Sequence, residues 1–202
     1  QRGMKPRLTV PALALALAFL AALPSAASAN PAAAAAPETL KIDRARSFID
    51  VDVNATVGSF TGRLERYVAT LALAPDGKVR TARLEFRFAD LRTGDADRDA
   101  RMLAWLGGGE PAGTYELGVL ALAPDGQGQA SGRLSFHGQN RRVEFPVLVT
   151  RTEETLTVTG ETTIDTRQWG LPPLRHRFVV KVDPEVRIRF RLTAPLPPPP
   201  EE

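Results

Sequence analysis

Apolar and polar side chains alternate with a period of two along much of the chain. Between positions 49 and 53, Ile49, Val51 and Val53 alternate with aspartates, and segments 82–88 and 186–192 alternate apolar with charged residues. Successive side chains of a strand point to opposite faces, so each segment predicts a strand with one apolar and one charged face. The same pattern predicts strands over 67–73, 115–122, 129–136, 142–149, 155–164 and 177–182.

Turn residues divide these segments. The tripeptide Pro-Asp-Gly occurs at 75–77 and at 124–126, where Pro presets φ, Asp caps the turn and Gly accepts a positive φ, so each predicts a hairpin. A single helix is expected over 95–106, because the segment begins with acids suited to a helix N-terminus and ends at three glycines, 107–109. Eight or more antiparallel strands with one inserted helix favour an all-β closed barrel. A β-sandwich would show the same alternation.

The N-terminal segment has the pattern of a secretory signal peptide. Lys5 and Arg7 precede an apolar run over 8–23, and Ala-Ser-Ala at 27–29 forms a small-residue cleavage site. The run is shorter than the roughly 20 residues that span a bilayer, so cleavage is favoured over an uncleaved anchor. We expect a signal peptide over 1–29, an Ala/Pro linker over 30–38, one folded domain over 39–194 and a Pro-rich tail over 195–202. The mature protein is expected in the periplasm or secreted, with no stable membrane span.

Charge and cysteine content exclude several classes of function. The net charge is +3, and the expected leader holds three of the basic residues and no acid, which leaves 23 basic against 23 acidic residues. A neutral chain lacks the positive field that nucleic-acid binding requires, so no nucleic-acid partner is expected. The chain has no cysteine, which removes thiol nucleophiles, disulfides and cysteine-based metal sites.

Three candidate chemistries fail on their residue patterns. Asp95, Asp97 and Asp99 open like a calcium loop, but Ala100 stands where Gly is needed and Leu106 where a bidentate Glu is needed. We therefore interpret them as helix-start acids and expect no metal site. No serine lies in the G-x-S-x-G motif of serine hydrolases. Asp50 and Asp52 could pass for the carboxylate pair of a glycosidase, but they are more simply part of the water-exposed outer face of the sheet.

The two histidines are weak candidates for chemistry. The sequence places His137 where a strand ends, and its imidazole could bind a ligand head group, although a turn histidine bonded to the backbone is the favoured interpretation. His176 lies between two arginines, where a solvated polar edge is expected. With no catalytic set and no cofactor motif, the chain is not expected to be an enzyme.

Several short segments, taken in their order along the chain, match the sequence pattern of a known family. They are Leu40-Lys-Ile-Asp43 with 47–53 and Phe60-Thr-Gly62-Arg-Leu64; Leu91-Arg-Thr93-Gly94 with 98–103; 134–138 with 143–147; and Asp165-Thr-Arg-Gln-Trp169-Gly170. Together they resemble the YceI-like family of periplasmic lipid-binding proteins. The chain departs from the family pattern at Arg101, where the family often has His, at Asn140 and Arg142 in the hairpin, and at the glycines 107–109 after the helix.

The resemblance implies an eight-stranded antiparallel lipocalin-like barrel with one short helix, holding an isoprenoid such as a polyprenol or a quinone tail in its lumen. The alternative is a non-enzymatic envelope module that binds partners and has a filled core. By alternation, and provided that no bulge reverses a strand's faces, the ligand-binding lumen residues are Ile49, Val51, Val53, Leu84, Phe86, Phe88, Tyr115, Leu117, Val119, Leu134, Phe136, Phe145, Val158, Ile188 and Phe190.

Overall fold

The computed structural model describes residues 38–176 and 180–197, with the side chains of 175, 176 and 180 left aside. The expected signal peptide, most of the linker, the end of the tail and part of the strand expected over 177–182 lie outside these residues. The elements in chain order are β1 (Glu38–Lys41), η1 (Arg44–Arg46), β2 (Phe48–Ala55), β3 (Gly58–Leu64), β4 (Tyr67–Leu73), β5 (Val79–Arg87), η2 (Phe88–Asp90), β6 (Leu91–Arg92), α1 (Ala96–Trp105), β7 (Ala112–Leu122), β8 (Gln127–Phe136), β9 (Gln139–Arg151), β10 (Thr155–Asp165), η3 (Thr166–Trp169), β11 (Arg175–His176) and β12 (Val180–Pro195).

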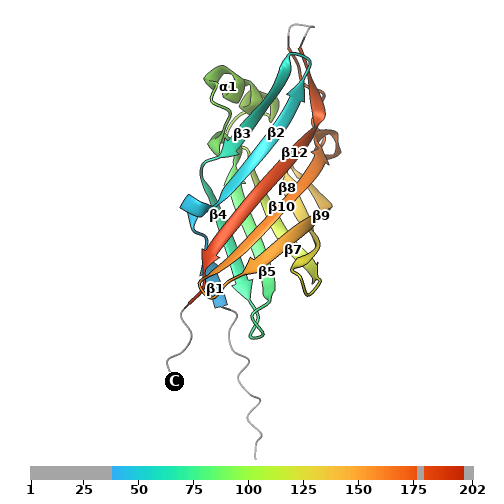
Figure 1. Cartoon of the computed structure of the whole chain (residues 1–202). Coiled ribbons are helices and arrows are strands. Elements are labelled where there is room, and N and C mark those ends of the chain that lie inside the picture. The colour runs from blue at the N-terminus through green and yellow to red at the C-terminus, as the bar shows by residue number, and fades with distance from the viewer. Residues whose placement is uncertain (1–37, 177–179, 198–202) are drawn as a thin grey trace, which may run out of the picture. The chain divides into compact units, whose positions relative to one another are not determined.

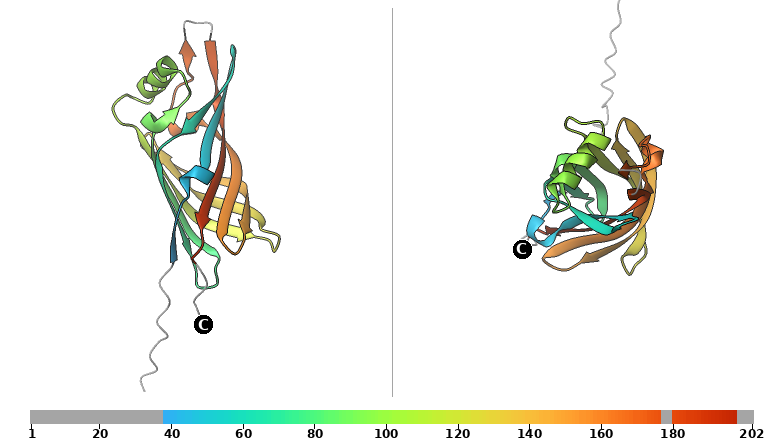
Figure 2. Two further views of the ribbon diagram at one scale, coloured as in Figure 1. Left: turned by 60° about the vertical axis from the view of Figure 1, so that its left-hand side comes forward. Right: turned by 90° about the horizontal axis from the view of Figure 1, so that it is seen from above.

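Eleven of these strands form one curled antiparallel sheet in the order β1-β4-β5-β7-β8-β9-β10-β12-β2-β3-β6, and β11 pairs with β12 (Figure 1). The all-β class and the single α-helix agree with the sequence. The sequence predicted eight strands, but the sheet has more, because short strands such as β1 and β6 add to the long ones. The view from above in Figure 2 shows the sheet curving round on itself, with α1 lying at one end.

The predicted hairpins and helix form where the turn chemistry placed them. Strands β4 and β5 pair across the first Pro-Asp-Gly, and β7 and β8 pair across the second. Gly77 and Gly126 have φ of 77° and 82°, the left-handed region that glycine adopts without strain. The carboxylate of Asp95 caps α1 by accepting a hydrogen bond from the N–H of Arg98, which confirms the helix-start interpretation.

A two-residue corner joins the two edges of the sheet. Strand β3 ends at Leu64 and β4 begins at Tyr67, yet the two strands lie near opposite ends of the hydrogen-bonded order. The chain therefore stops pairing with β2 and starts pairing with β5 within the corner Glu65–Arg66. Because so short a link cannot cross a flat sheet, the sheet must curl until its edges meet.

Asp90 holds this corner. The N–H of Glu65 donates to the Asp90 carbonyl at 2.9 Å. The buried Asp90 carboxylate accepts hydrogen bonds from Arg66 Nε at 2.7 Å and Arg87 Nε at 3.0 Å. Burial raises the pKa of this carboxyl, but the hydrogen bonds from Arg87 and Arg66 outweigh burial and hold the pKa below its usual value. The corner is thus fixed by both backbone and charged side chains.

The two edges of the sheet are also bridged just after the end of β1. Strand β1 pairs with β4, and the N–H of Asp43 then donates to the Thr193 carbonyl of β12 at 2.8 Å. An apolar cluster fills this end of the sheet and contains Leu40, Leu71, Leu73, Leu156 and Ala194. This end is therefore closed by packed side chains.

The two aspartates of β2, Asp50 and Asp52, lie on the outer face, as predicted, but Asp50 is shielded from solvent. Its exposed fraction is only 5%, because Arg63 binds its carboxylate through Nε and Nη2 at 2.8 and 2.9 Å. Asp52 binds Arg189 and Thr61. Cross-strand pairing with bulky arginines covers Asp50, which the alternation alone did not indicate.

Replacing Asp90 with Ala should lower the free energy of unfolding by about 2 kcal/mol, since two charge-assisted hydrogen bonds at the corner are lost. Because the folded pKa of Asp90 is depressed, its stabilising contribution is present above its unfolded pKa of about 4 and disappears as the pH falls through the folded value. Urea unfolding of wild type and Asp90→Ala between pH 7 and pH 3 measures this. A difference between the two proteins that stays constant with pH would contradict the assignment.

Candidate ligand-binding site

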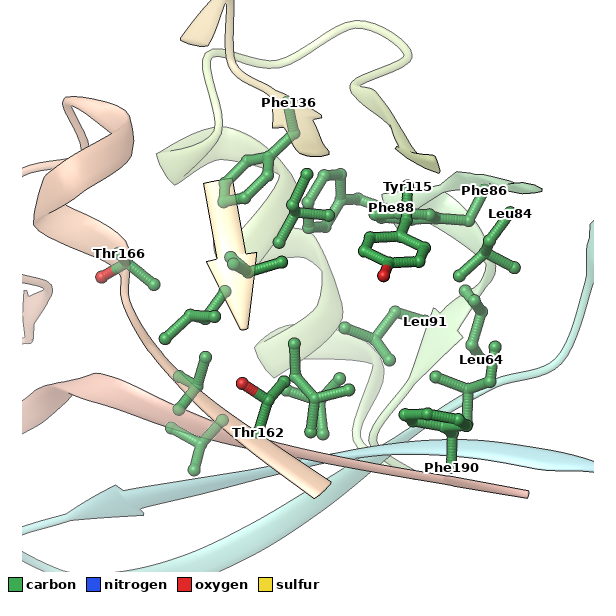
Figure 3. A pocket seen from close by; sticks show the side chains of 18 of the residues that line it. Leu64, Leu84, Phe86, Phe88, Leu91, Tyr115, Phe136, Thr162, Thr166 and Phe190 are labelled. Carbon is green, nitrogen blue, oxygen red and sulfur yellow. The ribbon is translucent and has the colours of Figure 1, made fainter. Parts of the chain in front are cut away.

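The curled sheet encloses an elongated apolar cavity of about 790 Å³. Figure 3 shows its wall, with Leu64, Leu84, Leu91 and Phe190 among the labelled side chains. The cavity reaches the surface where the β2–β3 turn and α1 lie, because the exposed side chains of Val57 and Arg101 belong to its lining. A volume of this size is within the range of small-molecule sites. The β-sandwich alternative does not describe this architecture.

The structure places fourteen of the fifteen predicted lumen side chains on the cavity wall. They come from seven strands and from η2, so the cavity is assembled by the whole sheet. These residues are Ile49, Val51, Val53, Leu84, Phe86, Phe88, Tyr115, Leu117, Leu134, Phe136, Phe145, Val158, Ile188 and Phe190.

Val119 is the exception, and the prediction for it was wrong. The pairing of β7 with β8 shifts register between Leu117 and Val119, so Gly118 is an extra residue that reverses the alternation. Val119 is 60% exposed and lies outside the cavity lining, whereas Leu120 lies on the wall. A bulge of this kind leaves no mark in the pattern of apolar positions.

Three aromatic side chains of the wall lie against glycines of neighbouring strands. A Cβ at Gly113 would come within 2.4 Å of the Phe86 ring, and one at Gly160 within 2.6 Å of the Phe190 ring. A Cβ at Gly132 would lie 2.5 Å from the Tyr115 hydroxyl. Each ring therefore occupies the space that a side chain of the next strand would fill. The rings cover the wall and leave the central space open.

Tyr115 carries an unusual hydroxyl. Its oxygen is buried and has no hydrogen-bond partner in the described part of the chain. Burial raises the pKa of the phenol to about 12, so the group stays protonated and neutral at physiological pH. In the ligand-free protein, an unpaired buried hydroxyl costs free energy.

Helix α1 contributes wall residues that the strand alternation did not point to. Arg98, Arg101, Met102, Trp105 and Leu106 all belong to the cavity lining. The amphipathic spacing within 95–106 was the signal that could have identified them. Contacts near both ends of the helix fix it over the cavity.

At its N-terminal end, the buried carboxylate of Asp99 accepts hydrogen bonds from the backbone N–H of Thr93 at 3.1 Å and from its hydroxyl at 2.7 Å. At its C-terminal end, Trp105 Nε1 donates to the Pro172 carbonyl at 2.8 Å. These contacts tie α1 to the segment before it and to the loop after η3, so the helix is held across the mouth of the cavity.

Of the two histidines, His137 has a structural role. His137 has a φ of 47°, and its Nδ1 lies 2.8 Å from the Trp169 carbonyl, which confirms the backbone-bonded turn histidine. The side chain of His176 lies outside the described residues. Within residues 38–176 and 180–197, no cluster of three His, Cys, Asp or Glu side chains could hold a metal ion.

Comparison with known protein families identifies the family of this chain. The model of the YceI-like domain matches residues 40–194. The chain belongs to the YceI-like family. No curated protein matches it. Among the helices of the described residues, none is long and apolar enough to cross a membrane.

Solved structures with the same fold include other YceI-like proteins. BcnA of Burkholderia cenocepacia is 20% identical, with 76% of this chain and 99% of that chain covered and a TM-score of 0.64. A polyisoprenoid-binding domain from Saccharophagus degradans, implicated in plant cell wall breakdown, is 19% identical, with 80% and 100% covered and a TM-score of 0.61. The Campylobacter jejuni YceI protein is 11% identical, with 67% and 84% covered and a TM-score of 0.57.

Replacing Tyr115 with Phe should stabilise the ligand-free protein by about 1 kcal/mol, because the substitution removes a buried hydroxyl without a partner and keeps the ring over Gly132. Urea unfolding of wild type and variant, each freed of any bound ligand, measures this difference. A loss of stability would show that the hydroxyl has a partner in solution.

Proposed function

We propose that this YceI-like protein is an exported, non-catalytic carrier that holds one isoprenoid-type lipid, such as a polyprenol or a quinone tail, in its cavity. The observation that carries the proposal is the cavity of about 790 Å³, whose wall is formed mainly by aliphatic and aromatic side chains of the sheet and α1. A long hydrocarbon chain needs such a tube and few polar anchors. The structural neighbour from Saccharophagus degradans, a polyisoprenoid-binding domain, supports the choice of ligand class.

The energetics favour a long apolar ligand. Each buried CH₂ contributes about 0.8 kcal/mol, so one isoprene unit fully buried contributes roughly 4 kcal/mol before the cost of ordering the chain. The wall is already formed without the ligand, because glycines receive the rings of Phe86 and Phe190. Binding then requires little rearrangement of the protein, so most of the free energy gained by burying the hydrocarbon is retained.

The alternative function, a partner-binding module with a core filled by side chains, has less support. It rested on the Pro-rich tail and on a filled core, and the tail from 198 onward lies outside the described residues. The cavity instead leaves space beside the packed cluster at the β1 end. Export is proposed from the leader pattern over 4–29, which precedes the described residues.

Native mass spectrometry of protein purified from a bacterial periplasm without detergent tests the function. We expect a stoichiometric adduct that organic extraction and fragmentation identify as an isoprenoid. A bare mass from folded protein that stays bare after incubation with polyprenols and quinones would overturn the proposal. The same preparation reports export directly, since the N-terminal residue of the mature chain shows whether cleavage follows residue 29.

Two substitutions on β7 form a matched pair for locating the ligand. Leu117→Arg places a charge on the cavity wall and should abolish copurified lipid, whereas Val119→Arg places the same charge on the outer face and should leave it unchanged. The two positions would share a face if the strand had no bulge. Lipid per folded protein, with circular dichroism as the folding control, is the readout.

If Leu117→Arg does not fold, Leu117→Gln carries the same test with a smaller perturbation. Equal lipid content in wild type and in a folded Leu117 variant would contradict binding in the cavity. Loss of lipid in Val119→Arg as well would contradict the described faces of β7.

A further inference from the structure

The open end of the cavity carries the most exposed large apolar side chain of the described residues. Val57 lies in the turn between β2 and β3 and is 72% exposed. It also belongs to the cavity lining, so it lies where a ligand would enter or leave. A single exposed valine is ordinary on a protein surface. The residues around it therefore decide whether it marks a contact site.

Three uncharged segments meet at this opening, and we call them the rim. They are 54–60 in the β2–β3 hairpin, 104–109 at the end of α1, and 170–174 after η3. None of them contains a charged residue, although 24% of the residues of the chain are charged. Each segment contributes to the cavity lining, and the hydrogen bond from Trp105 Nε1 to the Pro172 carbonyl joins the second segment to the third. The exposed residues of the rim include Val57, Ala104, Pro172, Pro173 and the glycines 107–109.

The charged side chains that reach the opening lie beside the rim and have other partners or long stems. The guanidinium carbon of Arg98 lies 4.2 Å from the centroid of the Phe60 ring, which connects α1 to the first rim segment. The Asp183 carboxylate accepts a hydrogen bond from the N–H of Glu185 at 3.0 Å. Arg101 is exposed, and its apolar stem lets the guanidinium group stay in water while the stem covers apolar surface.

The outer wall of the sheet has the opposite character. Ion pairs join neighbouring strands there, including Arg63 with Asp50 and Arg189 with Asp52. Moving charged groups out of water costs much free energy, so a wall that stays in water can carry them and a surface that enters an apolar medium cannot. Figure 1 shows α1 and the β2–β3 turn at one end of the sheet and the start of β1 at the other. The charge distribution thus singles out the rim as the surface suited to a partner of low polarity.

We propose that the rim docks on the surface of a lipid bilayer, so that a lipid passes between the bilayer and the cavity without crossing water. A lipid that leaves a bilayer through water exposes its whole hydrocarbon chain, and contact between the rim and the bilayer removes that exposure. The transfer step rests on the proposed function. The docking itself requires no bound lipid, because it depends on the apolar rim alone.

Flotation of ligand-free protein with vesicles of phosphatidylethanolamine and phosphatidylcholine tests the docking. Wild type should float with the vesicles and continue to do so as salt is raised, because the rim is uncharged. Val57→Asp and Pro173→Asp should each lower the ratio of vesicle-bound to free protein at least about tenfold, since each places a charge in the contact. Val119→Asp, at an exposed valine on the outer face of β7, is the matched control and should float like wild type. Circular dichroism confirms that the variants are folded.

Four results would overturn the docking. Wild type that does not float overturns it and leaves the carrier standing. Equal loss of flotation in Val57→Asp and Val119→Asp overturns it, since the rim then has no special part. Flotation that disappears as salt is raised assigns the contact to charged groups outside the rim. A wild-type dimer that Val57→Asp dissociates, with no flotation, identifies a second copy of the chain as the partner of the rim.

Movement of a pyrene-labelled prenol from loaded protein to acceptor vesicles tests the transfer step. The rate should rise with vesicle concentration if contact carries the lipid, whereas release through water gives a rate that does not depend on it. Pro173→Asp, which is exposed and outside the cavity lining, should slow transfer at least about tenfold. It should leave the dissociation constant of the prenol in vesicle-free buffer unchanged.

The outcomes separate transfer by contact from the proposed function. A rate that stays constant with vesicle concentration overturns transfer by contact, and the carrier stands. A prenol that wild type does not bind overturns the carrier, and the flotation of ligand-free protein still decides the docking.

Discussion

The corner at Glu65–Arg66 is the constraint on which the rest of the structure depends. Two residues connect strands near opposite edges of an eleven-strand order, so the sheet has to curl around its own inner face. Asp90 secures the corner through the Glu65 N–H and the guanidinium groups of Arg66 and Arg87. The inner face that results is apolar by alternation, and the cavity follows from the curvature rather than from any single lining residue.

An apolar space inside a protein tends to be filled, since side chains lining an empty volume lose contacts. Here the large rings are turned onto glycines of adjacent strands, Phe86 onto Gly113 and Phe190 onto Gly160. Because those positions have no side chain, the rings can pack directly against the neighbouring strands. A ligand that fills the remaining space would restore the lost contacts and stabilise the native state by mass action, so the proposed function links lipid occupancy to stability.

Much of this arrangement could be predicted from the sequence. Alternation assigned fourteen side chains to the inner face that line the cavity in the structure, and turn chemistry located both hairpins and the Asp95 cap. The bulge at Gly118 was missed although a glycine within a strand can mark one, because segment 117–122 has no polar side chain to show which face points outward, and Val119 was misplaced as a result. The burial of Asp50 was also missed, since it depends on Arg63 thirteen residues away in the chain and on the pairing of β2 with β3.

The two ends of the apolar cavity differ, and this difference would give a ligand a direction. One end is closed by the cluster of Leu40, Leu71 and Leu156 with their neighbours. The other end carries α1, whose contacts through Asp99 and Trp105 hold it over the mouth. A hydrocarbon gains most by lying toward the closed end, while a polar head retains hydration only at the mouth. For the proposed ligand, the fold therefore favours a tail-inward orientation, with the head group at the end of the cavity that carries α1.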